Sequence, residues 1–212
     1  VKLLDGDGNE LATDTTDSNG NYLFTDLPQG DYTVEVDTAT LPDDVQQTYD
    51  ADGLGTPDES SLTLGAGEDN LDQDFGYQPL GTIGDRVWFD DNGDTLESIG
   101  EDGIPNVTVK LLDSNGNEID TDTTDSNGEY LFEDLPQGDY TVMVDPSTLP
   151  DDVQQTYDAD GVGTPDMSSL SLPSGGDNLD QDFGYQPLGT IGDRVWFDDN
   201  GDGVQDGGEA GI

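Results

Sequence analysis

Residues 107–144 read VTVKLLDSNGNEIDTDTTDSNGEYLFEDLPQGDYTVMV, and this stretch decides the fold class. Val107, Val109 and Leu111 alternate with polar residues, which is the pattern of a strand that buries one face. The turn at 113–117, DSNGN, suits a hairpin because Asn and Gly tolerate positive φ angles. Only 30% of the chain is hydrophobic, but the apolar residues recur in short ordered runs. The pattern therefore predicts β-structure and not a disordered acidic tail.

Similar runs recur along the neighbouring sequence at intervals typical of an all-β domain. We expect strands at 82–89, 107–113, 119–124, 130–132, 140–144, 153–157, 168–172 and 179–185. Turn residues separate these runs, and no stretch has the period of a long amphipathic helix. Eight short strands of this kind predict an all-β fold built as a β-sandwich.

A repeat of 108 residues organises the chain. Val109 begins a copy of the sequence that starts at Val1, and LGTIGDRVWFDDNGD at 80–94 recurs unchanged at 188–202. Self-similarity this close is typical of tandem arrays. The sequence therefore predicts tandem copies of one domain.

The spacing of the repeat divides the chain unevenly. Residues 80–187 form one complete domain, 1–79 form a domain without its first strand and first acidic loop, and 188–212 supply the first strand and loop of a following repeat. We expect Ile212 of one unit to lie near Val1 of the next, because only a short joint separates them in the pattern. Either the polypeptide continues as an array, which the pattern favours, or separate chains join by strand donation into a fibre.

The charge of the chain limits the kinds of partner that it can bind. Lys and Arg number 4 against 50 Asp and Glu, which gives a formal net charge of −46. Such a surface repels DNA, RNA and anionic lipid, so we expect no nucleic-acid partner and no membrane insertion. No run approaches the roughly 20 apolar residues of a membrane-spanning helix. The partners must instead be cations.

The absence of two residue types narrows the chemistry. The chain has no Cys and no His, so disulfides, thiolate metal sites and the commonest general base are missing. Paired carboxylates could in principle hydrolyse glycosides. Here, however, the acids occur at metal-ligand or turn spacing, and we therefore expect no enzymatic activity.

The sharpest motif is DDNGDGVQDGGE at 198–209. It fits the calcium-loop pattern D-x-[DN]-x-[DN]-G-x5-E at every fixed position, with Gly203 at the sharp turn. The predicted Ca²⁺ ligands are Asp198, Asn200, Asp202, the backbone carbonyl of Val204, Asp206 and Glu209. The alternative is a solvated acidic loop. Strand-like sequence precedes the motif, so the loop belongs to a β-domain and not to a helical EF-hand.

The other copy of this loop, at 90–101, keeps the ligand types. Its predicted ligands are Asp90, Asn92, Asp94, the carbonyl of Leu96, Ser98 and Glu101. Thr95 replaces the central Gly, so we expect a weaker or differently shaped site.

Further acidic clusters could hold additional ions. The members are Asp158, Asp160 and Asp166 in one cluster, Asp177, Asp180 and Asp182 in a second, and Asp122, Asp125 and Asn127 in a third. If the first two clusters meet across one end of the sandwich, Asp158, Asp160, Asp180 and Asp182 would form another Ca²⁺ site. Turn-forming Asp with solvated charge explains the same residues.

Two tryptophans could be misread as a sugar-binding platform. Trp88 and Trp196 lie at strand spacing beside Phe89 and Phe197. Aromatic residues at this spacing are more often core, and we expect core packing here.

The residues quoted above, together with DNLDQDFGY at 177–185, resemble the B-repeat (SdrD B-like) domain of staphylococcal serine-aspartate repeat surface proteins, relatives of collagen-adhesin B-type modules. The similarity covers the whole 108-residue unit. It implies a prealbumin-like or immunoglobulin-like sandwich, several calcium ions per domain and a stiff stalk at a cell surface. Some B-type modules carry a Lys–Asn isopeptide crosslink. Lys2 and Lys110 lie in the corresponding strand, but alternation places Lys110 opposite the apolar face, and we expect no crosslink.

These observations together predict a calcium-stabilised structural repeat of an extracellular bacterial surface protein, in an adhesin stalk or fibre. Neighbouring repeats of the same protein would be its partners. The alternative is a carbohydrate- or protein-binding module of a secreted adhesin. Specific, calcium-dependent capture of a ligand by the isolated 80–187 unit would favour that alternative.

Overall fold

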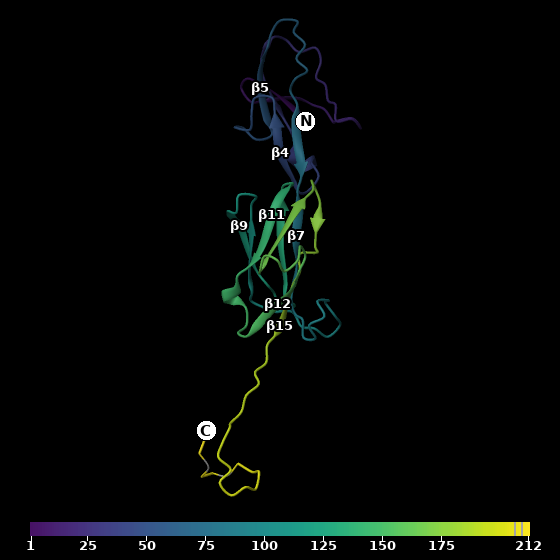
Figure 1. The fold of residues 1–212 in the computed structure, drawn as a ribbon. Helices are drawn as coiled ribbons and strands as arrows, with labels where there is room; N and C mark the ends of the chain where they lie inside the picture. Colours follow the sequence, from purple (N-terminus) through teal and green to yellow (C-terminus); the bar gives the residue numbers. More distant parts are fainter. Residues whose placement is uncertain (206, 209) are drawn as a thin grey trace.

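The chain forms two β-units in a row, followed by an extended segment (Figure 1). The computed structural model describes residues 1–205, 207–208 and 210–212. Strands of the first unit are β1 (Lys2–Asp5), β2 (Glu10–Thr13), β3 (Gly30–Glu35), β4 (Val45–Asp50), β5 (Glu59–Leu64) and β6 (Phe75–Pro79). Strands of the second unit are β7 (Gly81–Phe89), β8 (Thr108–Leu112), β9 (Glu118–Thr123), β10 (Glu129–Leu135), β11 (Gly138–Val144), β12 (Val153–Asp158), β13 (Met167–Leu172), β14 (Asp177–Asn178) and β15 (Phe183–Pro187). Within the described residues the helical elements are the short 3-10 turns η1 (Thr38–Thr40) and η2 (Pro146–Thr148).

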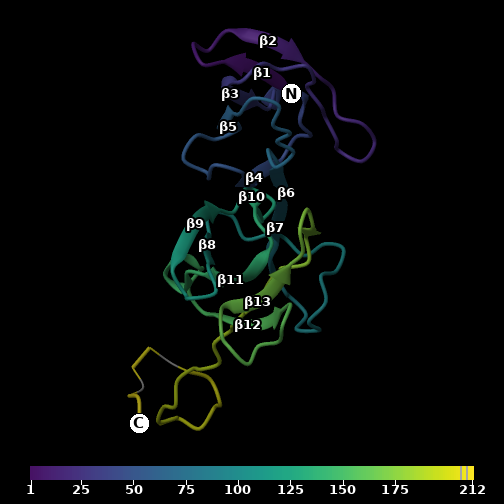
Figure 2. The same ribbon diagram turned by 90° about the horizontal axis from the view of Figure 1, so that it is seen from above.

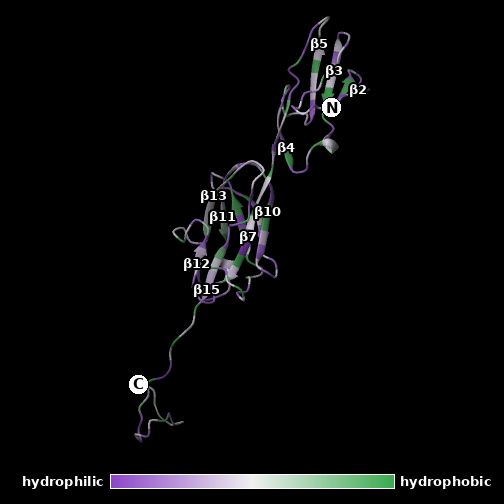
Figure 3. Ribbon diagram, turned by 90° about the vertical axis from the view of Figure 1, so that its right-hand side faces the viewer, coloured by the Kyte–Doolittle hydropathy of each residue, from purple (hydrophilic) through white to green (hydrophobic). Residues whose placement is uncertain are grey.

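The second unit is a sandwich of two sheets, which confirms the predicted all-β fold class. One sheet has the order β13-β11-β8-β9 and the other β10-β7-β15-β12. Figure 2 shows strands of both sheets around the interior of the unit, and Figure 3 shows hydrophobic stretches in the strands and hydrophilic loops between them. Val107, Val109 and Leu111 are fully buried in the core that both sheets share. Lys110 lies on the opposite face, as its alternation predicted.

The hairpin between β8 and β9 forms at the predicted turn. One carboxylate oxygen of Asp113 accepts the backbone N–H groups of Asn115 at 2.8 Å and Asn117 at 2.9 Å. Gly116 supplies a positive φ of 80°. Hydrogen bonds from Asn117 lower the pKa of Asp113 to about 2, because they stabilise its charged form.

Strand β7 holds the second sheet together. It pairs antiparallel with β10 and parallel with β14 and β15. Ile83 and Val87 are fully buried on this central strand. The buried positions of β7 do not alternate simply, because Ile83 and Gly84 are buried in succession, as are Val87 and Trp88.

One predicted strand is too long. The sequence favoured a strand at 179–185, but β15 begins at Phe183 and residues 179–182 run outside the ladder. The hydroxyl of Tyr130 donates to the carbonyl of Gln181, and the hydroxyl of Ser168 bonds the Gln181 side chain at 2.8 Å. The N–H of Gln181 also donates to the carbonyl of Gly84 at 3.2 Å. These bonds hold residues 179–182 beside the sheet without a regular ladder, so periodicity alone could not detect the break.

The first unit repeats this architecture only in part. Its sheet β2-β1-β3-β5 matches β9-β8-β11-β13, and β4 pairs with β6 as β12 pairs with β15. Residues 21–27 correspond to β10 but form no strand, and among the described residues no strand of this unit occupies the position of β7. The ladder that orders β10 in the second unit is therefore missing.

Residues 188–212 extend away from the second unit at the end opposite the first unit (Figure 1). The described residues of this segment form no named strand, and an isolated β-bridge joins Trp196 to Gly211. The described residues of this segment therefore form a small closed loop at the end of an extended connection.

Candidate metal sites

The loop at 90–101 leaves the end of β7 and returns to the same strand. The N–H of Phe89 donates to the carbonyl of Asp102 at 2.9 Å, and the N–H of Ile104 donates to Val87 at 2.8 Å. These bonds close the loop at its base. The rigid central strand of the sheet therefore positions the predicted ligands.

Asp90 is the centre of this loop, and its side chain is fully buried. One carboxylate oxygen accepts the N–H groups of Gly93 at 2.7 Å and Asp94 at 3.1 Å, and the other accepts Thr95 at 3.1 Å. Burial alone would raise the pKa of Asp90, but the Thr156 side chain and then these N–H donors hold it below its ordinary value. Asp90 is thus a buried anion at physiological pH.

The other early ligand positions shape the loop in the same way. The Oδ1 atom of Asn92 accepts the N–H of Asp94 at 2.7 Å, and Oδ1 of Asp94 accepts the N–H of Leu96 at 2.9 Å. Alternating Asx turns of this kind coil a backbone around a central point. The residues predicted to bind an ion therefore also determine the conformation of the loop.

Glu101 closes the loop with a buried carboxylate, 8% exposed. Its Oε2 atom accepts the N–H of Ser98 at 2.9 Å, whereas Oε1 is buried with no hydrogen-bond partner among the described residues. An unsatisfied buried carboxylate oxygen is costly. A cation in the loop would remove that cost.

The loop at 198–204 repeats these bonds one for one. Asp198 accepts the N–H groups of Gly201 at 2.7 Å, Asp202 at 3.2 Å and Gly203 at 2.9 Å. Asn200 accepts Asp202 at 2.9 Å, and Asp202 accepts Val204 at 2.8 Å. The same conformation thus forms without a sandwich beside it. The predicted ligands Asp206 and Glu209 lie outside the described residues.

The sequence predicts that the two loops differ in shape. At the central position, however, their backbones have the same conformation. Thr95 has a φ of 65° and Gly203 a φ of 75°, and their neighbours make equivalent hydrogen bonds. The replacement instead places a β-branched residue in the left-handed region, which costs conformational energy. Its effect on ion affinity stays a prediction.

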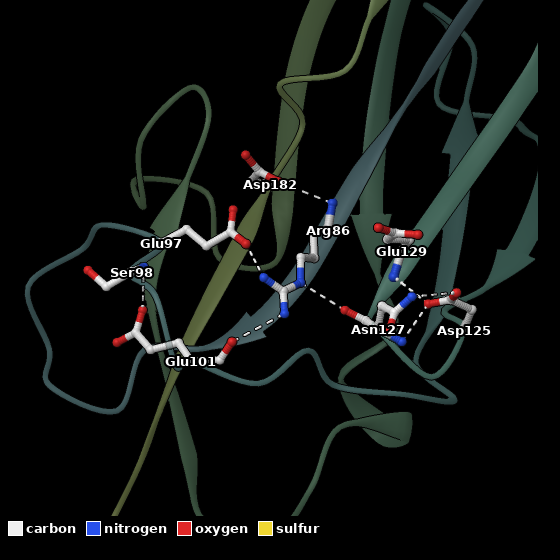
Figure 4. A network of polar contacts seen from close by, with 8 residues as sticks. All are labelled: Arg86, Glu97, Ser98, Glu101, Asp125, Asn127, Glu129 and Asp182. Atoms are coloured by element: carbon white, nitrogen blue, oxygen red, sulfur yellow. Dashed lines mark hydrogen bonds and ion pairs between the residues drawn. The ribbon is translucent and has the colours of Figure 1, made fainter.

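Arg86 connects the loop to the rest of the sandwich (Figure 4). Its guanidinium pairs with Glu97 and donates to the carbonyls of Glu101 at 3.2 Å and Asn127 at 2.8 Å. Arg86 also donates its backbone N–H to Asp182 at 3.1 Å. One cation therefore links three loops at this end of the unit.

Acidic residues crowd around Arg86. Burial, and then the charges of Asp85, Glu97 and Asp180, raise the pKa of Asp182 to about 7. Burial and the charge of Glu97 also raise the pKa of Asp85. Sequence reasoning missed Asp85 and Glu97. A sequence signal was available for Asp85, which is an acidic residue within a strand-like stretch. Strands rarely place carboxylates beside a core without a partner.

Charges from both acidic clusters, Asp158 in one and Asp180 and Asp182 in the other, raise the pKa of Tyr157 after burial, and the ion site predicted from these clusters stays a prediction. Burial and a hydrogen bond with Asp160 raise the pKa of Asp158 to about 6. Among the described residues, no three Asp or Glu side chains are grouped so that they alone could hold a metal ion. An EF-type loop, by contrast, takes part of its shell from Asn, backbone carbonyls and water.

Several predicted candidates have structural roles instead. Asp166 accepts the hydroxyl of Tyr185 at 2.8 Å, and Asp177 accepts the hydroxyl of Thr82 at 2.9 Å. Asp125 accepts the N–H of Asn127 at 2.7 Å, which is the Asx turn given as the alternative explanation. Asp122 accepts the N–H of Leu131 at 2.9 Å. These bonds account for the recurring Asp residues at turns and sheet edges.

Trp88 is a core residue, as predicted, whereas Trp196 is only half-buried and Phe197 is 54% exposed. Trp88 is 1% exposed, and its ring lies 5.4 Å from that of Tyr157. No sugar can stack on Trp88 in this position.

Lys110 forms ion pairs with Glu118 at 3.4 Å and Asp145 at 3.7 Å.

Known proteins with sequences similar to this chain point to one family. The profile of the family described as SdrD B-like domain matches residues 1–77 and 81–185. Serine-aspartate repeat-containing protein F of Staphylococcus epidermidis is 38% identical over 222 residues, covering 100% of this chain and 13% of that protein. Serine-aspartate repeat-containing protein E of Staphylococcus aureus (strain USA300) is 39% identical over 206 residues, covering 93% of this chain and 18% of that protein. The chain thus spans less than a fifth of the length of these relatives.

Solved structures are more distant. The Bacillus anthracis TIE protein superposes with a TM-score of 0.42 at 17% identity, covering 88% of this chain and 30% of that one. GBS52, the minor pilin of Streptococcus agalactiae, gives 0.39 at 14% identity, covering 84% and 68%. These scores are too low to support conclusions about this chain.

Proposed function

Because the chain belongs to the SdrD B-like domain family, we propose that it is a calcium-stabilised structural repeat of an extracellular bacterial surface protein, built into an adhesin stalk or fibre. Its units lie in a row, as in a spacer (Figure 1). The N–H of Gly175 donates to Pro79 at 3.1 Å, so adjacent repeats contact each other at the joint. Within the described part of the chain, no helix has the length and apolar character needed to span a bilayer.

The buried carboxylates of the loop at 90–101 carry the calcium proposal. Asp90 is fully buried, and Glu101 holds a buried oxygen without a hydrogen-bond donor. The chain has only 4 Lys and Arg against 50 Asp and Glu, so its own cations cannot neutralise its acids. Hard oxygen ligands at this spacing suit Ca²⁺ better than Mg²⁺, which requires a smaller octahedral shell.

Each loop would hold its ion with the residues that already shape it. In the first loop these are Asp90, Asn92, Asp94, the Leu96 carbonyl, Ser98 and Glu101. In the second they begin with Asp198, Asn200, Asp202 and the Val204 carbonyl. The raised pKa values of Asp158 and Asp182 mark where a further cation would relieve repulsion. Calcium would thereby fix the ends of each sandwich and the orientation of successive domains.

The test is a calcium titration of chelator-stripped protein. The melting temperature of the wild type should rise with calcium, because a ligand specific for the native state stabilises it by mass action. Magnesium should raise it much less. Glu101→Gln should weaken calcium binding by calorimetry, whereas Asp91→Asn, at an exposed neighbour in the same loop, should not. A melting temperature that is the same with and without calcium contradicts the proposal.

Trp88 gives no support to the alternative of a carbohydrate-binding module, because it belongs to the core. The proposal also assigns no catalytic role. The acids near Arg86 serve as charges to be neutralised and not as a split pair across a substrate cleft.

A further inference from the structure

The outer strands β9 and β10 lie side by side on one side of the second unit. β9 is the outer strand of the sheet β13-β11-β8-β9, and β10 is the outer strand of the sheet β10-β7-β15-β12. The two strands contact each other where the sheets meet. An outer strand presents N–H and C=O groups without a neighbouring strand, and a strand of another molecule can add there. This side of the sandwich is therefore a template for pairing between chains.

The N–H groups of β9 point alternately towards β8 and away from it. Thr124, which follows β9, donates its N–H to the carbonyl of Val107 at 2.9 Å, on the side of β8. By alternation, the N–H of Thr123 points away from β8. The Oδ1 atom of Asp122 accepts this N–H at 2.7 Å. The outward donor is thus bound within the molecule.

An outward N–H of β10 is bound by the same side chain. The carbonyl of Gly128 points towards β7, where it accepts the N–H of Val87 at 2.9 Å. The N–H of Leu131, three residues further along, therefore points away from β7. The second carboxylate oxygen of Asp122, Oδ2, accepts it at 2.9 Å. One Asp thus binds outward donors of two edge strands that belong to different sheets.

The register of β9 explains how Asp122 reaches both strands. Asp122 lies opposite Val109, which is fully buried in the core. Paired residues share one face of a sheet, so Asp122 points inward, where alternation alone would place an apolar side chain. A charged residue that points inward from an edge strand is one of the devices by which proteins prevent edge-to-edge pairing.

The first unit keeps this arrangement although a neighbouring residue differs. The Oδ1 atom of Asp14 accepts the N–H of Thr15 at 2.8 Å, and Oδ2 accepts the N–H of Leu23 at 2.9 Å. These bonds match those of Asp122. The counterpart of Asp120, by contrast, is Ala12. The acid that makes both bonds is therefore the one that the two repeats share.

The opposite side of the sandwich has a corresponding bond. The Oδ2 atom of Asp160, which follows β12, accepts the N–H of Ser169 in the outer strand β13 at 2.8 Å. In the first unit, Oδ2 of Asp52 accepts the N–H of Ser61 in β5 at 2.8 Å. On each side the Asp lies nine residues before the N–H that it binds. This recurrence distinguishes these aspartates from acids that are only solvated.

We propose that Asp122 in the second unit and Asp14 in the first close this side of each repeat against an added β-strand, by binding its outward N–H donors. The partner that they exclude is the same edge of a second copy of this chain. Two copies of one edge can pair about a twofold axis, because each edge contains both donors and acceptors. This role is separate from the proposed calcium sites, since both residues lie outside the loops at 90–101 and 198–209.

Three substitutions separate hydrogen bonding from charge. Asp122→Ala removes the acceptor, whereas Asp122→Asn keeps a carbonyl oxygen, and each variant loses one negative charge. Asp120→Ala also loses one charge, and the first unit already has Ala12 at this position. Asp120→Ala is therefore the control for charge and position.

Amide hydrogen exchange, followed by NMR, tests the bond to β10. The N–H of Leu131 should exchange at least several-fold faster in Asp122→Ala than in the wild type or Asp120→Ala, because its acceptor is gone. The amide of Val109 in the core should stay protected, which shows that the variant is folded. Equal exchange at Leu131 in all three proteins overturns the proposal.

Analytical ultracentrifugation of the full chain tests the excluded partner, in about 1 M salt, where the screening length is about 3 Å. Asp122→Ala should form a concentration-dependent species of twice the 22.5 kDa mass of the chain, under conditions where the wild type, Asp122→Asn and Asp120→Ala do not. Asp14→Ala should behave like Asp122→Ala and provides a second, independent variant. Ala variants that sediment as the wild type does overturn the proposal. Equal association of Asp122→Asn also overturns it, because the effect would then come from charge.

Discussion

Trp88 packs directly against Gly184 in the neighbouring strand: a Cβ on this glycine would lie 2.8 Å from the indole ring. The two residues are paired in the parallel ladder between β7 and β15. Trp88 is almost fully buried, so the ring has no room to move away. The strand that enters the second unit and the strand that leaves it are thus in contact through a glycine.

Gly184→Ala should destabilise the second unit by about 1–3 kcal/mol, because overpacking a filled core forces side chains and backbone apart. Gly163→Ala is the control, since the nearest atom to its Cβ lies 3.9 Å away. Urea unfolding can be followed by the fluorescence of Trp88 in a Trp196→Phe background. Equal midpoints for the two variants would show that the indole accommodates the methyl group.

Thr95→Gly should stabilise the loop at 90–101 by about 1 kcal/mol, because Thr95 holds a positive φ of 65° that glycine adopts without strain. The same change should tighten calcium binding if the loop is the ion site. Thr95→Ala keeps a Cβ in the left-handed region and is the matched control. Differential scanning and titration calorimetry measure both effects. An equal gain from Ala would trace the effect to the loss of the Thr side chain and not to backbone strain.

Arg86→Lys should destabilise the calcium-free second unit by about 1–3 kcal/mol, since an ammonium cannot reproduce the forked contacts to Glu97, Glu101 and Asn127. The expected readout is a lower thermal midpoint. Lys110→Gln is the control, because it removes a surface cation whose ion pairs contribute at most about 1 kcal/mol. A larger loss from Lys110→Gln would contradict the assigned importance of Arg86.

The calcium-free protein should lose stability as the pH rises from about 4 to 7. Burial raises the pKa of Asp182 to about 7 and that of Asp158 to about 6, above the ordinary 3.8. The native state therefore binds protons more tightly than the unfolded chain in this range, and that contribution is complete below the ordinary pKa and lost as the pH passes the folded value. Melting temperatures across the range measure the slope.

Asp182→Asn should flatten this pH dependence, because the amide cannot ionise. Asp151→Asn, at an exposed position on another loop, should leave it nearly unchanged. A wild-type melting temperature that rises over the same range without calcium would contradict the direction of the effect.

Periodicity predicted the strands well where a strand depends on its own residues. β8 and β11 alternate buried and exposed positions as the sequence indicates. Residues 21–27 fail the same test, although they closely match the residues of β10. In the second unit β10 pairs with β7, and the described part of the first unit has no strand at that position. Local sequence contains no information about whether such a distant strand is present.

The same distinction applies to the candidate sites: local motifs could be predicted from the sequence, and contacts between distant residues could not. Spacing alone predicted a coiled loop through Asp90, Asn92 and Asp94, because an Asx-turn loop is a local structure, and their role as ligands stays a prediction. The sequence did not predict the group of acidic residues around Asp182, since this group depends on Asp85 and Glu97 lying beside Asp182 across the sheet. A contact between residues almost a hundred positions apart follows from topology and not from a motif.

The parallel pairing of β7 with β15 determines how the unit responds to a pulling force. The chain enters the second unit through Gly81 at the start of β7 and leaves it through Pro187 at the end of β15. Tension on the two ends draws these neighbouring strands in opposite directions along their length. The backbone hydrogen bonds of this ladder, in which Val87 is paired with Phe183 and Phe89 with Tyr185, are then loaded together in shear, and they must break at once and not one after another. A row of such units would resist stretching at every repeat.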